Sequence, residues 1–291
     1  MKSPLRKRLP RELKSEFGKY LVVFIMMAIT IGFVSGFLVA DGSMLRAYDD
    51  SFQKYNIEDG YFQTKKKLTP AQKEDIEKSD VKVYENFYIE QKLTNGSTIR
   101  FFKNRKEVDK VCLMNGKMPK KSGEIAVDRM YADNNELKVG DTVKSRKKTF
   151  RITGLVALSD YSALFQNNND TMFDAVKFGV AIVTDKDFEA LNQVKVQYNY
   201  AWIYDKKPAT EKKEKKMAED LMEDMADVVT IESFVPQYQN QSIHFTGDDM
   251  GSDRAMIVML LYIVMAILAF VFGITISNTI TKESSAIGTL R

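Results

Sequence analysis

The sequence predicts a membrane protein in which two transmembrane α-helices flank an extracytoplasmic α+β domain. Two apolar runs, residues 20–40 and 255–281, contain no charged side chain. In a helix, about 20 apolar residues already cross the hydrocarbon core of a bilayer. The polar region between the runs, residues 41–254, mixes strand-like and helix-like patterns and is long enough to bury a core of its own.

The charge distribution agrees with this division. Residues 1–19 carry seven Lys or Arg side chains against two Glu, although the whole chain has a net charge of only +4. This basic lead follows the positive-inside rule, and the flanks that begin at residue 41 and end at residue 254 are acidic on balance. We therefore expect a plasma-membrane protein with both termini in the cytoplasm and residues 41–254 outside. A basic excess beside the membrane gives no support for nucleic-acid binding.

The first 40 residues are divided into a membrane-surface segment and a span. In residues 1–19, Leu9, Leu13 and Phe17 repeat every four positions, which predicts a short amphipathic helix on the inner membrane face; a solvated basic lead is the alternative. A secretory signal is the competing interpretation of residues 20–40, but the apolar core of such a signal is about 7–15 residues long. The longer run favours an uncleaved span.

Both spans carry pairs of small residues four positions apart. Gly32 and Gly36 form a GxxxG motif in the first span, and Gly273 with Ser277 repeats the spacing in the second. Small residues at this spacing let helix backbones approach closely in lipid. These four positions are predicted to be helix-packing sites.

The outer region begins with a predicted strand, helix and hairpin. Residues 60–64 have a strand pattern, and Thr69, Pro70 and Gln72 supply the N-cap, first-turn proline and capping-box partner of a helix to about residue 79. Residues 81–93 and 97–102 then alternate around Asn95 and Gly96, a strong hairpin signal.

A second strand, helix and strand follow near the end of the region. Residues 196–204 read as a strand, and Thr210 is a candidate cap for a helix in which Met217, Leu221 and Met225 repeat every four positions. Another strand is predicted from Val228. The two units suggest a compact α+β domain with a β-rich segment inserted between them.

The inserted segment has a recognisable order of turns and strands. It reads as a turn at Asn115 and Gly116, a strand over residues 124–127, a tight turn at Gly140 and Asp141, and a strand over residues 149–156. This pattern resembles the extracytoplasmic domain of the MacB/FtsX-like permeases of ABC transporters. In that family a Gly/Pro turn precedes Gly-Glu-Ile, then an apolar-x-apolar-Gly-Asp motif and a strand that ends in glycine.

The tail after the second span, residues 282–291, resembles the same family. It reads KESSAIGTLR, and in the family such an Ile-Gly-x-Leu-Arg core forms the coupling contact with the ATPase. The resemblance implies ATPase-coupling roles for Glu283, Ile287, Gly288, Leu290 and Arg291. Since the family's permeases continue to at least two more spans, we expect this chain to be a fragment or one repeat of a longer permease.

The partners implied by the resemblance are an ABC ATPase subunit, the remainder of the permease or a second permease copy, and the lipid bilayer. Movement driven by ATP in the ATPase would pass through the spans to the outer domain for export, extraction or signalling. The sequence itself has no GxxxxGK[ST] phosphate loop, so ATP hydrolysis is expected in a separate subunit.

Other candidate sites in the sequence favour structural roles. His244 is the only histidine and is expected in a polar loop, and Cys112, the only cysteine, is expected to be a small buried side chain. Residues 167–170 and Asp174 lack the glycine and glutamate of a calcium loop and are predicted to form a polar surface loop. Neither a cofactor, a metal site nor an enzymatic activity is predicted.

Two other classes of protein share this layout. A two-span receptor with an extracytoplasmic ligand-binding domain is the main alternative, but it should enter a heptad-patterned helix after the second span, which IGTLR fits poorly. A membrane-anchored extracellular enzyme would need a catalytic constellation that the sequence does not offer.

Overall fold

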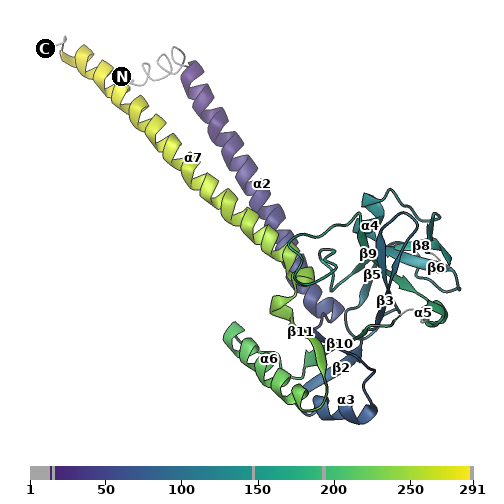
Figure 1. Cartoon of the computed structure of the whole chain (residues 1–291). Helices are drawn as coiled ribbons and strands as arrows, with labels where there is room; N and C mark the ends of the chain where they lie inside the picture. Colours follow the sequence, from purple (N-terminus) through teal and green to yellow (C-terminus); the bar gives the residue numbers. More distant parts are fainter. Residues whose placement is uncertain (1–13, 15–16, 146–147, 192–194, 289–291) are drawn as a thin grey trace. The chain divides into compact units, whose positions relative to one another are not determined.

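The computed structural model describes Lys14 and residues 17–145, 148–191 and 195–288 (Figure 1). The chain forms two compact units, one from residues 1–47 and 248–291 and the other from residues 48–247. The first unit holds parts of two long helices, and the second is an α+β domain. The predicted fold class, two apolar helices that flank an α+β domain, is confirmed.

The two long helices extend beyond the predicted spans. Helix α2 (Phe17–Tyr55) continues past residue 40, and helix α7 (Gln241–Gly288) begins before residue 255. Each contains an apolar window long enough to cross a membrane, and only 6% of each window is buried within the described chain. The core helix of a soluble protein would be mostly buried, so these helices are candidate spans. The predicted amphipathic helix of residues 1–19 falls almost entirely outside the described residues.

Within the first unit, α2 and α7 are joined by a few contacts. Val34 and Asp41 on α2 and Ile257 on α7 are buried, and Arg254 Nη1 lies 3.9 Å from Asp41 Oδ2. A buried carboxylate needs a cationic partner, so this pair fixes one contact between the helices.

The smaller sheet of the second unit contains both predicted strand, helix and strand units. Its strand order is β11-β1-β10-β2, with every pairing antiparallel. The first unit is β1 (Gly60–Thr64), α3 (Pro70–Glu77) and β2 (Val81–Glu85). The second is β10 (Tyr198–Tyr204), α6 (Glu211–Ala226) and β11 (Ile231–Pro236).

The predicted helix caps are present in both units. Thr69 and Gln72 form the capping box of α3, and the Thr210 side chain accepts a hydrogen bond from Lys213 N. Strand β11 begins three residues later than predicted, because the amides of Val228 and Val229 both bond to the Met225 carbonyl and extend the end of α6.

Strand β1 separates a hydrophobic core from a polar face. Phe62 points into the core that the sheet shares with α3 and α6, where Trp202 stacks on Phe234 with ring centroids 4.7 Å apart. Tyr61 and Gln63 point to the other face, since successive side chains of a strand alternate. This polar face is one wall of the pocket described below.

The larger sheet is the predicted β-rich insertion. Its order is β3-β4-β9-β6-β8-β5, with β7 also paired to β8, and the β4/β9 and β6/β8 pairs are parallel. The elements are β3 (Tyr88–Lys92), β4 (Thr98–Phe102), β5 (Val111–Gly116), β6 (Glu124–Asp128), α4 (Arg129–Asn134), β7 (Thr142–Lys144), β8 (Thr149–Leu158), β9 (Phe178–Val183) and α5 (Asp185–Leu191). The predicted hairpin around Asn95 and Gly96 is the β3–β4 pair.

Two sequence predictions in this region are wrong. Residues 81–93 are not one strand, because the chain leaves the smaller sheet at Asn86, whose amide bonds to the Asn199 carbonyl at 2.9 Å, and enters the larger sheet at Tyr88. Asn115 and Gly116 do not form a turn but end strand β5 after a bulge. Gly116 has φ +76°, and a Cβ there would lie 2.3 Å from the Thr153 carbonyl oxygen. The glycine is required for this close approach rather than for a turn.

Candidate functional site

The predicted ATPase-coupling residues lie at and beyond the end of α7. Glu283, Ile287 and Gly288 are in the helical backbone of its last turns, but the structure does not describe their side chains. Leu290 and Arg291 fall outside the described residues. Their coupling role therefore remains a prediction.

The predicted helix-packing residues face open space in the single chain. Among the described residues, nothing lies within 4 Å of the position that a Cβ would take at Gly32, Gly36 or Gly273. Ser277 is exposed. The contact between α2 and α7 is made elsewhere, and the packing of these small residues against further spans remains a prediction.

The first turns of α7 are tied to the α+β domain by hydrogen bonds. Ser162, which follows β8, donates its amide to the Ser242 carbonyl at 2.7 Å and its hydroxyl to the Ile243 carbonyl at 2.8 Å. The Tyr48 hydroxyl of α2 donates to the same Ile243 carbonyl at 3.0 Å. The ends of both long helices that belong to the second unit are therefore anchored to one another and to the larger sheet.

Two single residues lie differently from the sequence predictions. His244 is in helix α7 rather than in a polar loop, and its ring centroid is 6.2 Å from that of Phe52. Cys112 is half-buried on β5 rather than fully buried. Residues 167–170 do form the predicted polar loop, in which the Asp170 carboxylate accepts a hydrogen bond from Asn167 N.

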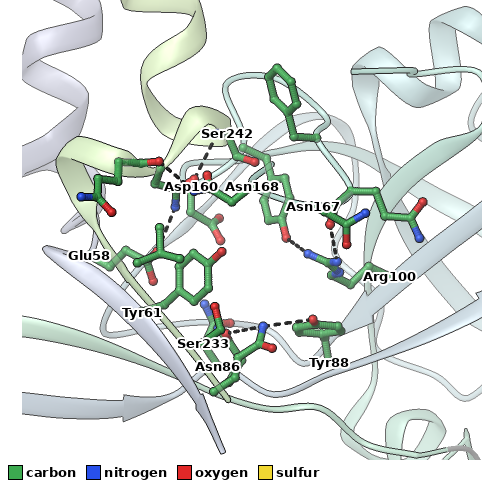
Figure 2. Close-up of a pocket in the computed structure, with 18 of the residues that line it drawn as sticks. Glu58, Tyr61, Asn86, Tyr88, Arg100, Asp160, Asn167, Asn168, Ser233 and Ser242 are labelled. Atoms are coloured by element: carbon green, nitrogen blue, oxygen red, sulfur yellow. Dashed lines mark hydrogen bonds between the residues drawn. The ribbon is translucent and has the colours of Figure 1, made fainter. Parts of the chain in front are cut away.

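A polar pocket of about 380 Å³ lies wholly within the second unit (Figure 2). Its walls come from both sheets and from the residues that precede α7, so sequence positions far apart contribute to it. Amide side chains dominate the lining, among them Gln63, Asn86, Asn168, Asn199 and Asn240. Sequence reasoning missed this pocket, because no local motif brings these residues together.

Arg100 on β4 supplies one charged wall and is held rigidly. Its guanidinium donates to Glu90 Oε1 through Nη2 at 2.6 Å and through Nε at 3.0 Å, and Glu90 lies directly opposite it on β3. Nη1 donates to the Tyr161 hydroxyl at 2.6 Å, and Cζ lies 4.1 Å from the ring centroid of Tyr88. The charge of Arg100 is therefore compensated within the protein.

Arg105 forms a second, deeper ion pair. Its Nη1 and Nη2 donate to the two carboxylate oxygens of Asp160, each at 2.7 Å. Nη1 also donates to Asn86 Oδ1 at 3.3 Å and lies 3.9 Å from Asp109 Oδ2. Arg105 thus binds Asp160 in a bidentate arrangement and lies near a second buried carboxyl group, that of Asp109.

Glu58 is a third buried carboxyl group beside this pair. It lies between α2 and β1, is 2% exposed, and accepts a hydrogen bond from Asn240 Nδ2 at Oε1 with a separation of 3.3 Å. Its backbone amide donates to Asp109 Oδ1 at 2.8 Å. Among the described residues no donor reaches Glu58 Oε2, but the side chains of Glu58 and Asp109 are hydrogen-bonded to one another, which requires a proton between them.

The crowding of carboxyl groups changes their acid–base behaviour. Burial, and then the negative charges of Asp109 and Asp160, raise the pKa of Glu58 well above its ordinary value. Burial and the charge of Asp160 raise the pKa of Asp109 to about 7. Glu58 and Asp109 therefore titrate as a coupled pair, and ionising both carboxyl groups is harder than ionising two ordinary ones.

Together, the two candidate spans and the α+β domain between them define a membrane protein with a folded domain of about 200 residues on one side of the membrane.

No family model matches the sequence. No curated protein matches it either.

Solved structures similar to this chain include two bacterial protein domains. The periplasmic region of MacB from Actinobacillus actinomycetemcomitans is 15% identical, with 60% of this chain and 87% of that chain covered and a TM-score of 0.33. The extracellular domain of the noncanonic ABC-type transporter YknZ from Gram-positive bacteria is 12% identical, with 60% of this chain and 98% of that chain covered and a TM-score of 0.31.

Proposed function

We propose that this chain is a permease subunit of a MacB/FtsX-like ABC transporter, or part of one, and that it relays movement from a partner ATPase to the α+β domain. In this arrangement the α+β domain is outside the cell, both termini are in the cytoplasm, and ATP hydrolysis occurs in the partner. The remainder of the permease or a second copy would pack against the two spans.

The observation that carries the proposal is the continuity of α7. This single helix runs from Gln241 to Gly288, through the apolar window and into the sequence that resembles a coupling segment. A continuous helix transmits displacement along its axis, whereas a flexible linker absorbs it. The hydrogen bonds of Ser162 to the first turn of α7 give such a displacement a point of attachment in the α+β domain.

The relay is tested by interrupting α7 after Thr281. A Gly/Ser insert of about seven residues, roughly two helical turns, should leave binding of the partner ATPase measurable but abolish ATP-dependent movement of the α+β domain. Movement is read from a fluorophore pair placed in the α+β domain and on the ATPase of the full transporter.

The matched control is an alanine insert of the same length. Alanine favours the helix, and an insert of this length rotates the following residues by only about 20°. The control should keep much of the ATP-dependent movement that the Gly/Ser insert removes. Equal movement in the Gly/Ser variant and the unaltered protein would reject the relay.

A further inference from the structure

The smaller sheet presents a row of polar side chains to the pocket. Ser233, Gln63 and Asn199 lie directly opposite one another on the neighbouring strands β11, β1 and β10. All three line the pocket, and Asn199 is only 7% exposed. Because neighbouring strands are about 4.8 Å apart, the row offers hydrogen-bonding groups at a regular spacing across the wall.

Part of this row is held in place and part is free to bind. Gln63 Nε2 donates to the Tyr88 hydroxyl and to Asn199 Oδ1, each at 3.2 Å, so both amide groups have a fixed orientation. In the part of the chain that the structure describes, Gln63 Oε1, Asn199 Nδ2 and Ser233 Oγ have no hydrogen-bond partner, and none of the three is sealed from solvent. An unpartnered amide donor on a side chain as buried as Asn199, which opens into a cavity, points to a ligand atom there.

Tyr61 extends the same wall. Its hydroxyl has no hydrogen-bond partner among the described residues, and its neighbours on β10 and β11, Ala201 and Val235, carry no polar side-chain group. Figure 2 shows Tyr61 and Ser233 on one wall of the pocket, across from Asn168. The Tyr61 ring adds an apolar surface beside the polar row.

Three charged side chains line the pocket, and each has a partner inside the protein. The pairs are Arg100 with Glu90, Asp160 with Arg105, and Glu58 with Asp109. Within the described lining, no charge is therefore left over for an ionic group of a ligand. A charged ligand would lose its hydration without gaining a partner, so the lining favours a neutral ligand.

The backbone of this wall is not available to a ligand. Strand β1 is paired with β10 on one side and β11 on the other, and β10 is also paired with β2. An extended peptide that adds to a sheet needs a free edge, which this wall does not offer. Recognition here must come from side chains, and amide and hydroxyl groups complement ligand hydroxyls, which also donate and accept. Alternate hydroxyl groups of a pyranose ring are about as far apart as neighbouring strands, about 4.8 Å.

We propose that this pocket binds a neutral saccharide of one or two rings. Its hydroxyl groups hydrogen-bond to the row of Ser233, Gln63 and Asn199 and to the Tyr61 hydroxyl, and its C–H face packs on the Tyr61 ring. The cavity of about 380 Å³ is at the lower end of the range for small-molecule sites, which suits a ligand of this size. The inference depends only on the α+β domain and goes beyond the proposed relay function, so either can fail without the other.

The test uses glucose and N-acetylglucosamine as neutral probes. They are titrated against the full chain in micelles of a detergent without a sugar head group, and saturation-transfer NMR should show saturable binding of at least one of them with a millimolar Kd. Glucuronate and glucosamine, the charged analogues of the two probes, should bind about tenfold more weakly, because no charge in the described lining is free to pair with them.

Tyr61→Phe locates the binding. The change removes one hydroxyl without breaking any hydrogen bond of the described chain, so the fold should be kept, and the Kd of the bound sugar should rise about two- to tenfold. The matched control is Tyr84→Phe on β2, which makes the same change outside the lining of this pocket and should leave the Kd unaltered.

Four results would overturn the inference. They are the absence of saturable binding of both sugars, equal binding of the charged analogues, an equal Kd in Tyr61→Phe and Tyr84→Phe, or tighter binding of N-acetylalanine methylamide, a model of the peptide backbone, than of either sugar. Three of these are measured on the unaltered chain, so the inference stays falsifiable whatever the variants do.

Discussion

At the scale of single residues, the buried carboxyl cluster governs how the α+β domain responds to pH. The native state holds a proton on Glu58 that the unfolded chain releases near the ordinary pKa of 4.5. The native state therefore binds more protons above that pH, and the free energy of unfolding falls as pH rises. The stability due to Glu58 is complete below about pH 4.5 and is lost as pH rises through its raised native pKa.

Glu58→Gln should remove part of this pH dependence. Glutamine has the shape of the protonated acid and no charge to bury. Between about pH 5 and pH 8, the free energy of unfolding should therefore fall less in the variant than in the unaltered chain, and the two decreases should differ by more than about 1 kcal/mol. Urea unfolding followed by the fluorescence of Trp202, the only tryptophan, reports on the α+β domain directly. Parallel curves of unfolding free energy against pH for the two proteins would contradict this assignment. The control is Glu232→Gln, at an exposed position on β11.

Arg105 is expected to be the most sensitive side chain of the cluster. Arg105→Met leaves Asp160 buried without its bidentate partner, and breaking a buried pair in this way costs about 3–5 kcal/mol. Arg151→Met removes an exposed guanidinium and should cost less than about 1 kcal/mol. If urea unfolding shows only a small loss in the free energy of unfolding for Arg105→Met, the ion pair of Arg105 does not hold Asp160 and Asp109 in place.

None of these residues could be identified from the sequence. Glu58, Asn86, Arg105, Asp109 and Asp160 lie in connections between elements, and only the crossing of the chain between the two sheets brings them together. By contrast, the caps at Thr69 and Thr210 were predictable, because a cap is a contact between residues three apart.

At the scale of elements, strand and helix types were predictable wherever a local pattern decides them. The hairpin at Asn95 and Gly96, strand β1 and both covering helices follow from alternation, turn residues and caps. The predicted turn at Asn115 and Gly116 failed for a tertiary reason: Gly116 is needed because β8 approaches its Cα, and a single sequence cannot distinguish this from a turn glycine.

Substitution of Gly116 separates these two uses of glycine. Gly116→Ala adds both the strain of φ +76° and a Cβ placed 2.3 Å from backbone oxygen, so the larger sheet must shift. Gly96→Ala, at φ +89° with no described atom within 4 Å of the added Cβ, carries only the backbone strain of about 1–2 kcal/mol. Gly116→Ala should therefore cost clearly more in the free energy of unfolding, and equal losses would contradict the close approach of β8.

At the scale of the whole molecule, the two spans and the domain between them were predictable because uncharged runs of this length have few alternatives. The extent of the two helices could not be predicted, since α2 continues into polar sequence after residue 40 and α7 begins in polar sequence before residue 255. The polar continuation of α7 is held by hydrogen bonds to Ser162, a contact that no local pattern encodes.

The most direct measurement of the central claim is the sidedness of the chain in intact cells. In a Cys112→Ser background, single cysteines at the exposed positions Lys212 and Ser284 are treated with a membrane-impermeant maleimide. The account predicts that Lys212→Cys is labelled in intact cells and that Ser284→Cys is labelled only after the membrane is permeabilised. Labelling of Ser284→Cys in intact cells, or protection of Lys212→Cys there, would contradict it.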